Sequence, residues 1–286
     1  MTREASAGPH AVLPPQPAAA RAVRETRGSG TLVARARGDR TVLARARASS
    51  PLRFLHPTFP GSHAATVCLV SFGGGLVDGD VIDLDLHVEA GATLVVFTQS
   101  TTKAFRGSSR QNIRAEVHGT LVLLPDPVSC FRGASFRQRV DIALYGEGST
   151  IALDGFTSGR AAFGDRWAFD RLDLATTITK DGRVLVRDAL RLDQREGPIG
   201  PRMDRFEAFA TVLAVGPSVS PLVTSILSPS VVSADVVAAP SPLLSSPSAA
   251  IVRIAATSPA LALSHARTRL RNLPDIDVVD PYACRQ

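Results

Sequence analysis

Cysteine is scarce in this chain, and long apolar runs are missing. The three cysteines, Cys68, Cys130 and Cys284, lie far apart and form neither a CxxC pair nor a Cys/His cluster. This spacing supports neither a disulfide framework nor a zinc site, and it fits a reduced compartment. Since no uncharged apolar run of about 18 residues occurs, no membrane span is predicted. The first residues also lack the compact apolar core of a secretory signal, so we expect a cytoplasmic protein.

Lysine and aromatic residues are also few. Lys103 and Lys180 are the only lysines, and aromatic residues make up 5% of a chain whose formal net charge is +6. Nucleic-acid-binding surfaces usually combine clustered basic residues with aromatic rings that stack on bases. Here the arginines are scattered among acidic residues, except near the N-terminus. The composition therefore argues against a nucleic-acid partner.

The N-terminal segment differs from the rest of the chain. Residues 1–27 are rich in alanine and proline and show no usable periodicity. Arg21, Arg24 and Arg27, with few acidic residues nearby, are also a feature of organelle transit peptides. The prolines prevent an amphipathic helix in this segment. We therefore predict a disordered tail over 1–27, followed by one β-rich domain over 28–286.

Short β-strand patterns begin at Thr31. The segments TLVARARG and TVLARARA flank Gly38-Asp39, which is a hairpin signal. Over 81–88, apolar residues alternate with Asp83, Asp85 and His87, which predicts a strand with one buried and one wet face. Further short strands follow without helices between them. The pattern predicts a mainly β fold, an antiparallel single domain with a few helices, mostly in the C-terminal third.

The second half of the chain carries more varied signals. A phase change between Trp167/Phe169 and Leu172/Leu174 suggests a β-bulge. Residues 217–250 are rich in serine and proline and predict only a short helix or loop. Ser258-Pro259 offers a helix N-cap followed by a first-turn proline. Apolar residues three to four apart then predict an amphipathic helix over 259–273.

Four stretches place glycine and polar residues between apolar strands. Taken singly, each is typical of a turn or of solvated surface charge. The polar run after the strand TLVVFT would also suit a cavity or an interface, because half-buried polar groups need partners. The stretches are SFGGGLVDGD at 71–80, TQSTTKAFRG at 98–107, LLPDPVSCFRGASFRQR at 123–139 and DGFTSGRAAFGDRWAFD at 154–170.

Together, and in this order and spacing, the four stretches resemble the UreD (UreH) family of urease accessory proteins. The lead-in PLRFLHPTFP, the segment VLAVGP at 212–217 and the terminal VDPY at 279–282 resemble family positions too. The resemblance covers roughly residues 28–282. It implies a largely β fold and an accessory protein rather than an enzyme. Gly164-Asp165 departs from the Gly-Glu that is frequent in the family, and the side chain is one methylene shorter.

The resemblance also implies partners and a cargo. They are apo-urease, a UreF-like accessory protein and, indirectly, a UreG-like GTPase. Nickel would pass through an internal water-filled tunnel to the urease active site, with no cofactor retained. Carboxylates and water hold Ni²⁺ more loosely than imidazole or thiolate, which suits a conduit. Our hypothesis is a nickel path lined or flanked by Asp80, Asp126 and Asp165, with Gln99, Thr102, Lys103 and Arg160 as polar wall or interface.

Two other classes of function remain open at this stage. A small-molecule enzyme on a β-barrel or sandwich could use two histidines and a carboxylate to hold a metal. It would need histidines on inward-facing strand positions, whereas His87 falls on the wet face of its strand and His118 precedes a glycine turn. Nucleic-acid binding by the basic chain is the second alternative, and it predicts an affinity that falls steeply with salt.

Overall fold

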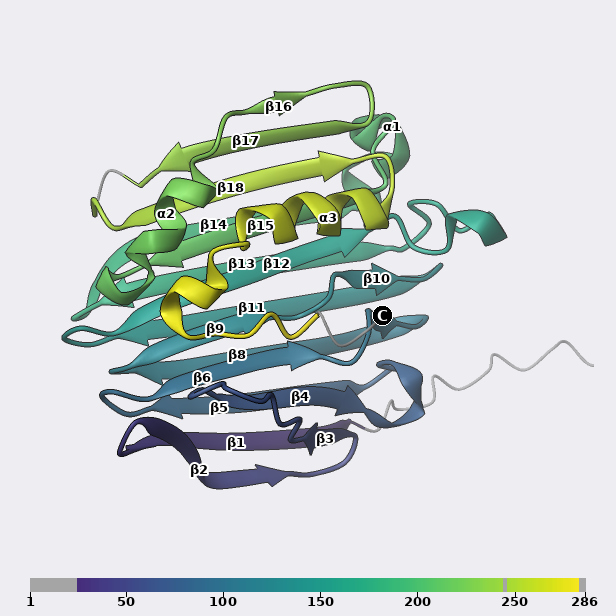
Figure 1. Cartoon of the computed structure of the whole chain (residues 1–286). Coiled ribbons are helices and arrows are strands. Elements are labelled where there is room, and N and C mark those ends of the chain that lie inside the picture. The colour runs from purple at the N-terminus through teal and green to yellow at the C-terminus, as the bar shows by residue number, and fades with distance from the viewer. Residues whose placement is uncertain (1–24, 244–245, 283–286) are drawn as a thin grey trace, which may run out of the picture.

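Two stacked β-sheets form the body of the protein in the computed structural model, which describes residues 25–243 and 246–282 (Figure 1). The first sheet has seven strands, in the order β14 (Arg183–Asp193), β13 (Arg171–Lys180), β11 (Ala134–Leu144), β8 (Gly107–Val117), β5 (Asp80–Val88), β1 (Thr26–Arg37) and β2 (Arg40–Ala48). The second is ordered β16 (Val231–Val232), β17 (Val236–Pro242), β18 (Ala249–Ala256), β15 (Ala208–Val215), β12 (Ser149–Thr157), β9 (Thr120–Leu124), β6 (Thr93–Thr98), β4 (Ala65–Ser71) and β3 (Leu52–Leu55). The short strands β7 (Thr102–Ala104) and β10 (Val128–Cys130) pair with each other, and β10 also pairs with β12.

The central part of the chain winds back and forth between the two sheets. Strands β5, β8 and β11 of the first sheet begin at residues 80, 107 and 134, one every 27 residues. Strands of the second sheet follow each of them, so chain neighbours are not sheet neighbours. The paired strands along this winding are parallel, as in β5–β8, β8–β11 and β6–β9.

The predicted mainly β fold with few helices is confirmed, but its antiparallel character is corrected. Short links without helices favour antiparallel pairing in the sequence, whereas most of them carry the chain across to the opposite sheet. Antiparallel pairs occur toward the ends of the sheets, among them β1–β2, β13–β14, β3–β4 and β15–β18. The hairpin predicted at Gly38-Asp39 is one of these.

Apolar side chains fill the space between the sheets, and helices cover the far side of the second sheet. Alternate residues of β5, such as Leu84 and Leu86, are fully buried between the sheets, while the intervening acids face solvent. The outer face of β12, β15 and β18 packs against α2 (Ser220–Ile226) and α3 (Pro259–Arg269) (Figure 1). The remaining helical segments are α1 (Ile199–Met203), η1 (Phe72–Gly74), η2 (Ala161–Phe163), η3 (Gln194–Glu196), η4 (Pro217–Val219) and η5 (Leu273–Ile276).

The structure refines several other predictions. The predicted C-terminal helix is α3, and its Ser258 hydroxyl accepts the Leu261 N–H as an N-cap. The phase change near Trp167 is not a bulge, because Trp167 lies in a loop with a left-handed backbone and β13 begins only at Arg171. Most of the predicted tail lies outside the described residues, and its last two residues begin β1. None of the described helices is long and apolar enough to cross a membrane.

Tyr282, in the terminal VDPY segment, anchors the end of the described chain. Its side chain is buried, its hydroxyl donates to the Leu124 carbonyl at 2.5 Å, and the Arg267 guanidinium lies 4.4 Å from its ring centroid. A buried carbonyl that loses its donor costs the desolvation of that group. The tyrosine therefore ties the C-terminal segment to β9.

We expect Tyr282→Phe to lower the free energy of unfolding by about 1–2 kcal/mol, because the Leu124 carbonyl loses its buried donor. Urea unfolding followed by circular dichroism measures the change. Tyr145→Phe is the matched control, because the Tyr145 ring is exposed and stacks on His118 at the surface. Equal effects of the two substitutions would contradict the anchoring role.

Candidate functional site

The four polar stretches singled out in the sequence come together at one edge of the molecule. Strands β5, β8, β11 and β13 run parallel, so the loops that precede them meet at the same end of the first sheet. These loops, residues 72–79, 105–106, 131–133 and 158–170, lie at the right-hand edge in Figure 1. Backbone hydrogen bonds join them in series, including Gly107 N–H to the Gly133 carbonyl and Gly133 N–H to the Ala168 carbonyl.

Glycine is required where the first loop contacts the second. The Leu76 N–H donates to the Lys103 carbonyl at 2.7 Å, and the Phe105 N–H donates to the Leu76 carbonyl at 2.8 Å. A Cβ on Gly75 would lie 2.5 Å from that same Lys103 carbonyl oxygen. The motifs GGGLVDGD and TQSTTKAFRG therefore depend on each other, because one packs its backbone directly against the other.

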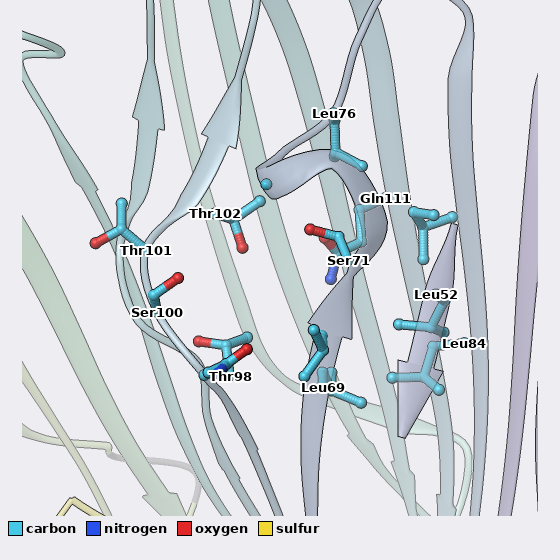
Figure 2. Close-up of a pocket in the computed structure, with 14 residues that line it drawn as sticks. Leu52, Leu69, Ser71, Leu76, Leu84, Thr98, Ser100, Thr101, Thr102 and Gln111 are labelled. Carbon is cyan, nitrogen blue, oxygen red and sulfur yellow. The ribbon is translucent and has the colours of Figure 1, made fainter. Parts of the chain in front are cut away.

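A cavity of about 120 Å³ opens between the sheets beside this edge. Gln99 and Thr102, predicted as polar wall, are among its lining residues, whereas Lys103 is exposed and not among them. Figure 2 shows Thr98, Ser100 and Thr102 on one side of the cavity and Leu52, Leu69 and Leu84 on the other. The cavity is thus polar along the second stretch and mainly apolar elsewhere, where Ser71 and Gln111 add polar groups.

Asp80 and Asp126 flank this cavity without lining it. The buried Asp80 carboxylate accepts the Val77 N–H at 2.8 Å and so closes the loop before β5. The buried Asp126 carboxylate accepts from the Thr98 hydroxyl at 3.3 Å, and that hydroxyl accepts the Asp126 N–H at 2.8 Å. Because Thr98 lines the cavity, Asp126 is one hydrogen bond away from it.

Asp165 belongs to a separate arginine cluster on the same edge. Its buried carboxylate accepts from Arg160 Nε at 3.0 Å and Arg132 Nε at 2.9 Å. These hydrogen bonds, the one from Arg160 first, lower the pKa of Asp165 below its usual value. The Arg160 guanidinium also lies over the Phe131 ring, 4.4 Å from the centroid, beside the exposed Phe163. Both predicted residues therefore shape the loop over 158–170.

Cys130 is a core residue. It ends β10, its side chain is 1% exposed, and burial raises the pKa of its thiol to about 12. A thiol that stays protonated is a poor metal ligand. Within residues 25–243 and 246–282 the structure contains no group of three or more His, Cys, Asp and Glu side chains placed to hold a metal ion.

A row of polar side chains, Gln111, Gln138 and Asp154, crosses the otherwise apolar interior. Gln111 of β8 lines the first cavity, and its direct neighbour in the sheet is Gln138 of β11. Gln138 Nε2 donates across the interior to Asp154 Oδ1 of β12 at 3.0 Å. The row therefore leads from the first cavity toward the opposite side of the sheet sandwich.

The row ends at a second cavity of about 160 Å³ between the sheets. Asp154, Asp188 and Arg253 are among its lining residues, and Arg253 donates to Asp188 at 2.8 Å. Burial, together with the neighbouring Asp188 charge, raises the pKa of Asp154 to about 6, against the hydrogen bonds from Gly155 and Gln138. Two carboxylates thus face a cavity that is open to solvent on the side of Arg253 and is otherwise bordered mainly by apolar side chains.

Comparison with known proteins matches the chain to one family over nearly all of its described length. The family model "UreD urease accessory protein" covers residues 26–273. The chain belongs to the UreD family of urease accessory proteins. A Sorangium cellulosum protein named urease accessory protein UreD is 41% identical over 263 residues, which is 90% of this chain and 83% of that protein. A protein of the same name from Anaeromyxobacter is 38% identical over 247 residues, which is 82% of this chain and 82% of that protein. Urease accessory protein D of Arabidopsis thaliana is 33% identical over 177 residues, which is 58% of this chain and 60% of that protein.

The interior row of this UreD-family chain was not selected from its sequence, although the sequence carries a signal for it. In β11, Gln138 shares the apolar phase of Phe136 and Val140, and in β8 Gln111 shares the phase of Ile113. Asp154 is the only charged residue in the strand STIALDGFT. A polar residue on an apolar phase marks a buried polar group. Asp154 was grouped with surface charges because it belongs to the same sequence stretch, 154–170, as Asp165 and two arginines.

We expect Asp154→Asn to stabilise the protein at neutral pH by about 1–3 kcal/mol, since a shift of about two pKa units corresponds to this amount. An asparagine still accepts from Gln138 and no longer has to be ionised in the interior. Because the folded pKa of Asp154 is raised, the wild-type chain loses this stability as the pH rises from about 4 to about 6. The urea midpoints of the wild-type chain and the Asp154→Asn variant should be equal at about pH 4, and the variant should have the higher midpoint at about pH 7.5.

We expect Gly75→Ala to destabilise the loop edge by about 1–3 kcal/mol, because the added methyl group meets the Lys103 carbonyl. Gly200→Ala is the matched control, since a Cβ there meets only Trp167 atoms at 3.8 Å and beyond. Thermal unfolding of both variants measures the difference. A Gly75→Ala protein as stable as the control would show that the first two motifs do not depend on close packing.

Proposed function

We propose that this chain is a non-catalytic scaffold in the assembly of the urease nickel centre and that nickel crosses its interior along the polar row. Membership of the urease accessory family supports the first part. The observation that supports the second part is the row of the buried Gln138 and the partly buried Gln111 and Asp154, whose two ends line separate cavities between the sheets.

The chemistry of the row suits a cation that has to be released again. Amide and carboxylate oxygens are weaker ligands for Ni²⁺ than imidazole or thiolate. Buried polar groups cost stability unless they are matched by hydrogen bonds or by a ligand. Asp154 supplies a negative charge at the inner end of the path, and Asp188 supplies a second one that is partly offset by Arg253.

The residues predicted from the sequence take supporting positions in this proposal. Asp126 flanks the first cavity through Thr98, where Gln99 and Thr102 form polar wall. Asp80 holds the loop beside Lys103 in place. Asp165 and Arg160 order the exposed loop at the same edge, which would act as an interface and not as part of the interior path.

The proposal also names the partners and the compartment. Apo-urease and a UreF-like accessory protein would bind the chain directly, and a UreG-like GTPase would reach it through the UreF-like protein. Nickel would be a cargo in transit, with no cofactor retained, in the cytoplasm. The exposed Phe163, flanked by Arg160, is the kind of aromatic and arginine pair that is enriched where proteins dock.

The first test is co-expression of apo-urease and the other accessory proteins with and without this chain. We expect urease activity and its nickel content, measured by mass spectrometry of the purified enzyme, to require the chain. Urease that matures equally well without it would overturn the accessory role for this chain.

The path is tested by Asp154→Asn in the same system. Because the carboxylate is lost while the fold gains stability, nickel content should fall by about tenfold although the variant still co-purifies with its partners. Asp141→Asn is the control, since Asp141 is exposed on the outer face of β11. Full nickel loading with Asp154→Asn would reject the interior path while leaving the scaffold role intact.

A further inference from the structure

The ribbon formed by β1 and β2 carries an unusual concentration of positive charge. Residues 26–48 contain six arginines and one aspartate, a net charge of +5, in a chain whose formal net charge is +6. Five of these arginines, which we call the ribbon arginines, follow Val33 in the sequence. They are Arg35, Arg37, Arg40, Arg45 and Arg47.

Strand register places all five ribbon arginines on one face. Arg35 and Arg37 share a face of β1, and they lie opposite Val42 and Arg40 of β2. Strict alternation would then put Arg45 on the other face. The register shift between Val33 and Ala34 inserts an extra residue in β2, so Arg45 pairs with Val33 and Arg47 with Thr31. The bulge therefore brings both ARAR segments to the outer face of the first sheet.

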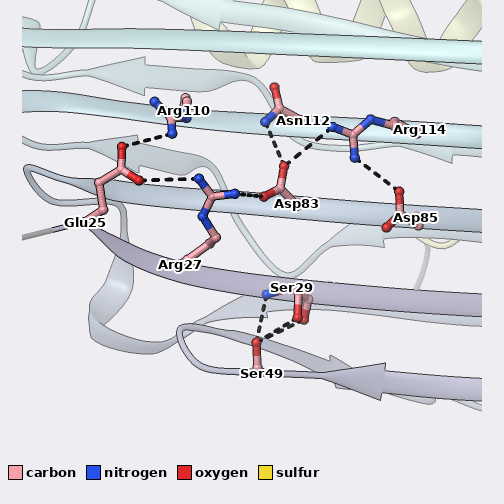
Figure 3. A network of polar contacts seen from close by, with 9 residues as sticks. All are labelled: Glu25, Arg27, Ser29, Ser49, Asp83, Asp85, Arg110, Asn112 and Arg114. Atoms are coloured by element: carbon pink, nitrogen blue, oxygen red, sulfur yellow. Dashed lines mark hydrogen bonds and ion pairs between the residues drawn. The ribbon is translucent and has the colours of Figure 1, made fainter.

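On the neighbouring strands β5 and β8, the charged side chains of the outer face pair with one another or with residues 25 and 27. Figure 3 shows Asp83 and Asp85 of β5 facing Arg27, Arg114 and Asn112, with Glu25 between Arg27 and Arg110. The ribbon arginines are different. Arg35 pairs bidentately with Glu89, both bonds measuring 2.8 Å. Among the described residues, none of the other four has a carboxylate within 4.0 Å, and all of them are partly or largely exposed.

Most of the outer edge of the ribbon has no backbone partner among the described residues. Strand β2 is the last strand of the first sheet. Its start is covered, because the Thr41 N–H donates to the His63 carbonyl at 2.8 Å. Beyond that point, no backbone hydrogen bond outside the β1 ladder joins residues 42–48 to another described residue. An unpaired strand edge accepts an added strand from another chain.

We propose that this edge binds an extended acidic protein segment, which adds to β2 as a further strand and places acidic side chains against the ribbon arginines. Alternate residues of such a segment would point to the outer face, beside Arg45 and Arg47. The pair Arg35–Glu89 shows the bidentate contact that each carboxylate could make. The site is separate from the interior row and does not rest on the proposed nickel path.

Two rival occupants are disfavoured by the same surface. A nucleic acid strand would be expected to stack its bases on aromatic rings, and residues 26–48 contain no aromatic residue. A second copy of the chain would bring its own ribbon arginines and meet like charge. Arginines on an edge strand could also serve only to prevent aggregation, and this explanation predicts a different outcome in the experiment below.

The experiment measures binding of a fluorescein-labelled ten-residue peptide of alternating Glu and Thr to the full chain by anisotropy. Binding should weaken as salt is raised and should be lost when alternate peptide nitrogens are methylated, because strand pairing needs their N–H groups. The double variant Arg45→Glu/Arg47→Glu should weaken binding by on the order of tenfold and should instead bind a Lys/Thr peptide.

The control Arg139→Glu/Arg187→Glu makes the same change of net charge on the outer face of β11 and β14, away from the free edge. It should leave peptide affinity unchanged. Equal loss in both double variants, unaltered binding of the methylated peptide or tighter binding of an oligo-dT strand would each overturn the proposal. So would an Arg45→Glu/Arg47→Glu chain that aggregates in size-exclusion chromatography yet binds the peptide normally.

Discussion

Close packing between two sheets whose central strands run parallel is the constraint on which the rest of this structure depends. Each turn of the winding sends one strand to each sheet, and the alternate residues of both strands must fill the same narrow interior. Leu84, Leu86 and Leu94 meet this requirement with aliphatic side chains that are at most 1% exposed. A polar group in that interior is stable only if another polar group meets it, as Gln138 meets Asp154.

The same winding creates both candidate functional regions, the loop edge and the interior row. Because β5, β8, β11 and β13 run parallel, their preceding loops gather at one edge and interlock, with Gly75 against Lys103. The interior row lowers the free energy of unfolding at neutral pH, because Asp154 is then ionised in surroundings that raise its pKa. Sites that lower stability in this way are the places where function and folding make opposite demands.

Patterns within one strand were readable from the sequence, and patterns between strands were not. The alternation over 81–88 predicted β5, and Gly38-Asp39 predicted the β1–β2 hairpin. The parallel pairing was missed because a short link looks the same whether it turns back or crosses to another sheet. Asp154 was misjudged for a similar reason, since it falls in the same sequence stretch as Arg160 and Asp165, whereas in the structure it faces Gln138 and an apolar core.

The sequence by itself determined the strand content, the four glycine-rich polar stretches and, through them, the family. These features are local, because they depend on side-chain periodicity and on backbone freedom within a few residues. Only the tertiary structure decided that the four stretches share one edge, that Gln111, Gln138 and Asp154 form a row, and that a bulge unites the ribbon arginines. Such placements follow from strand register across the sheets, and register is set by the packing of residues that are distant in the chain.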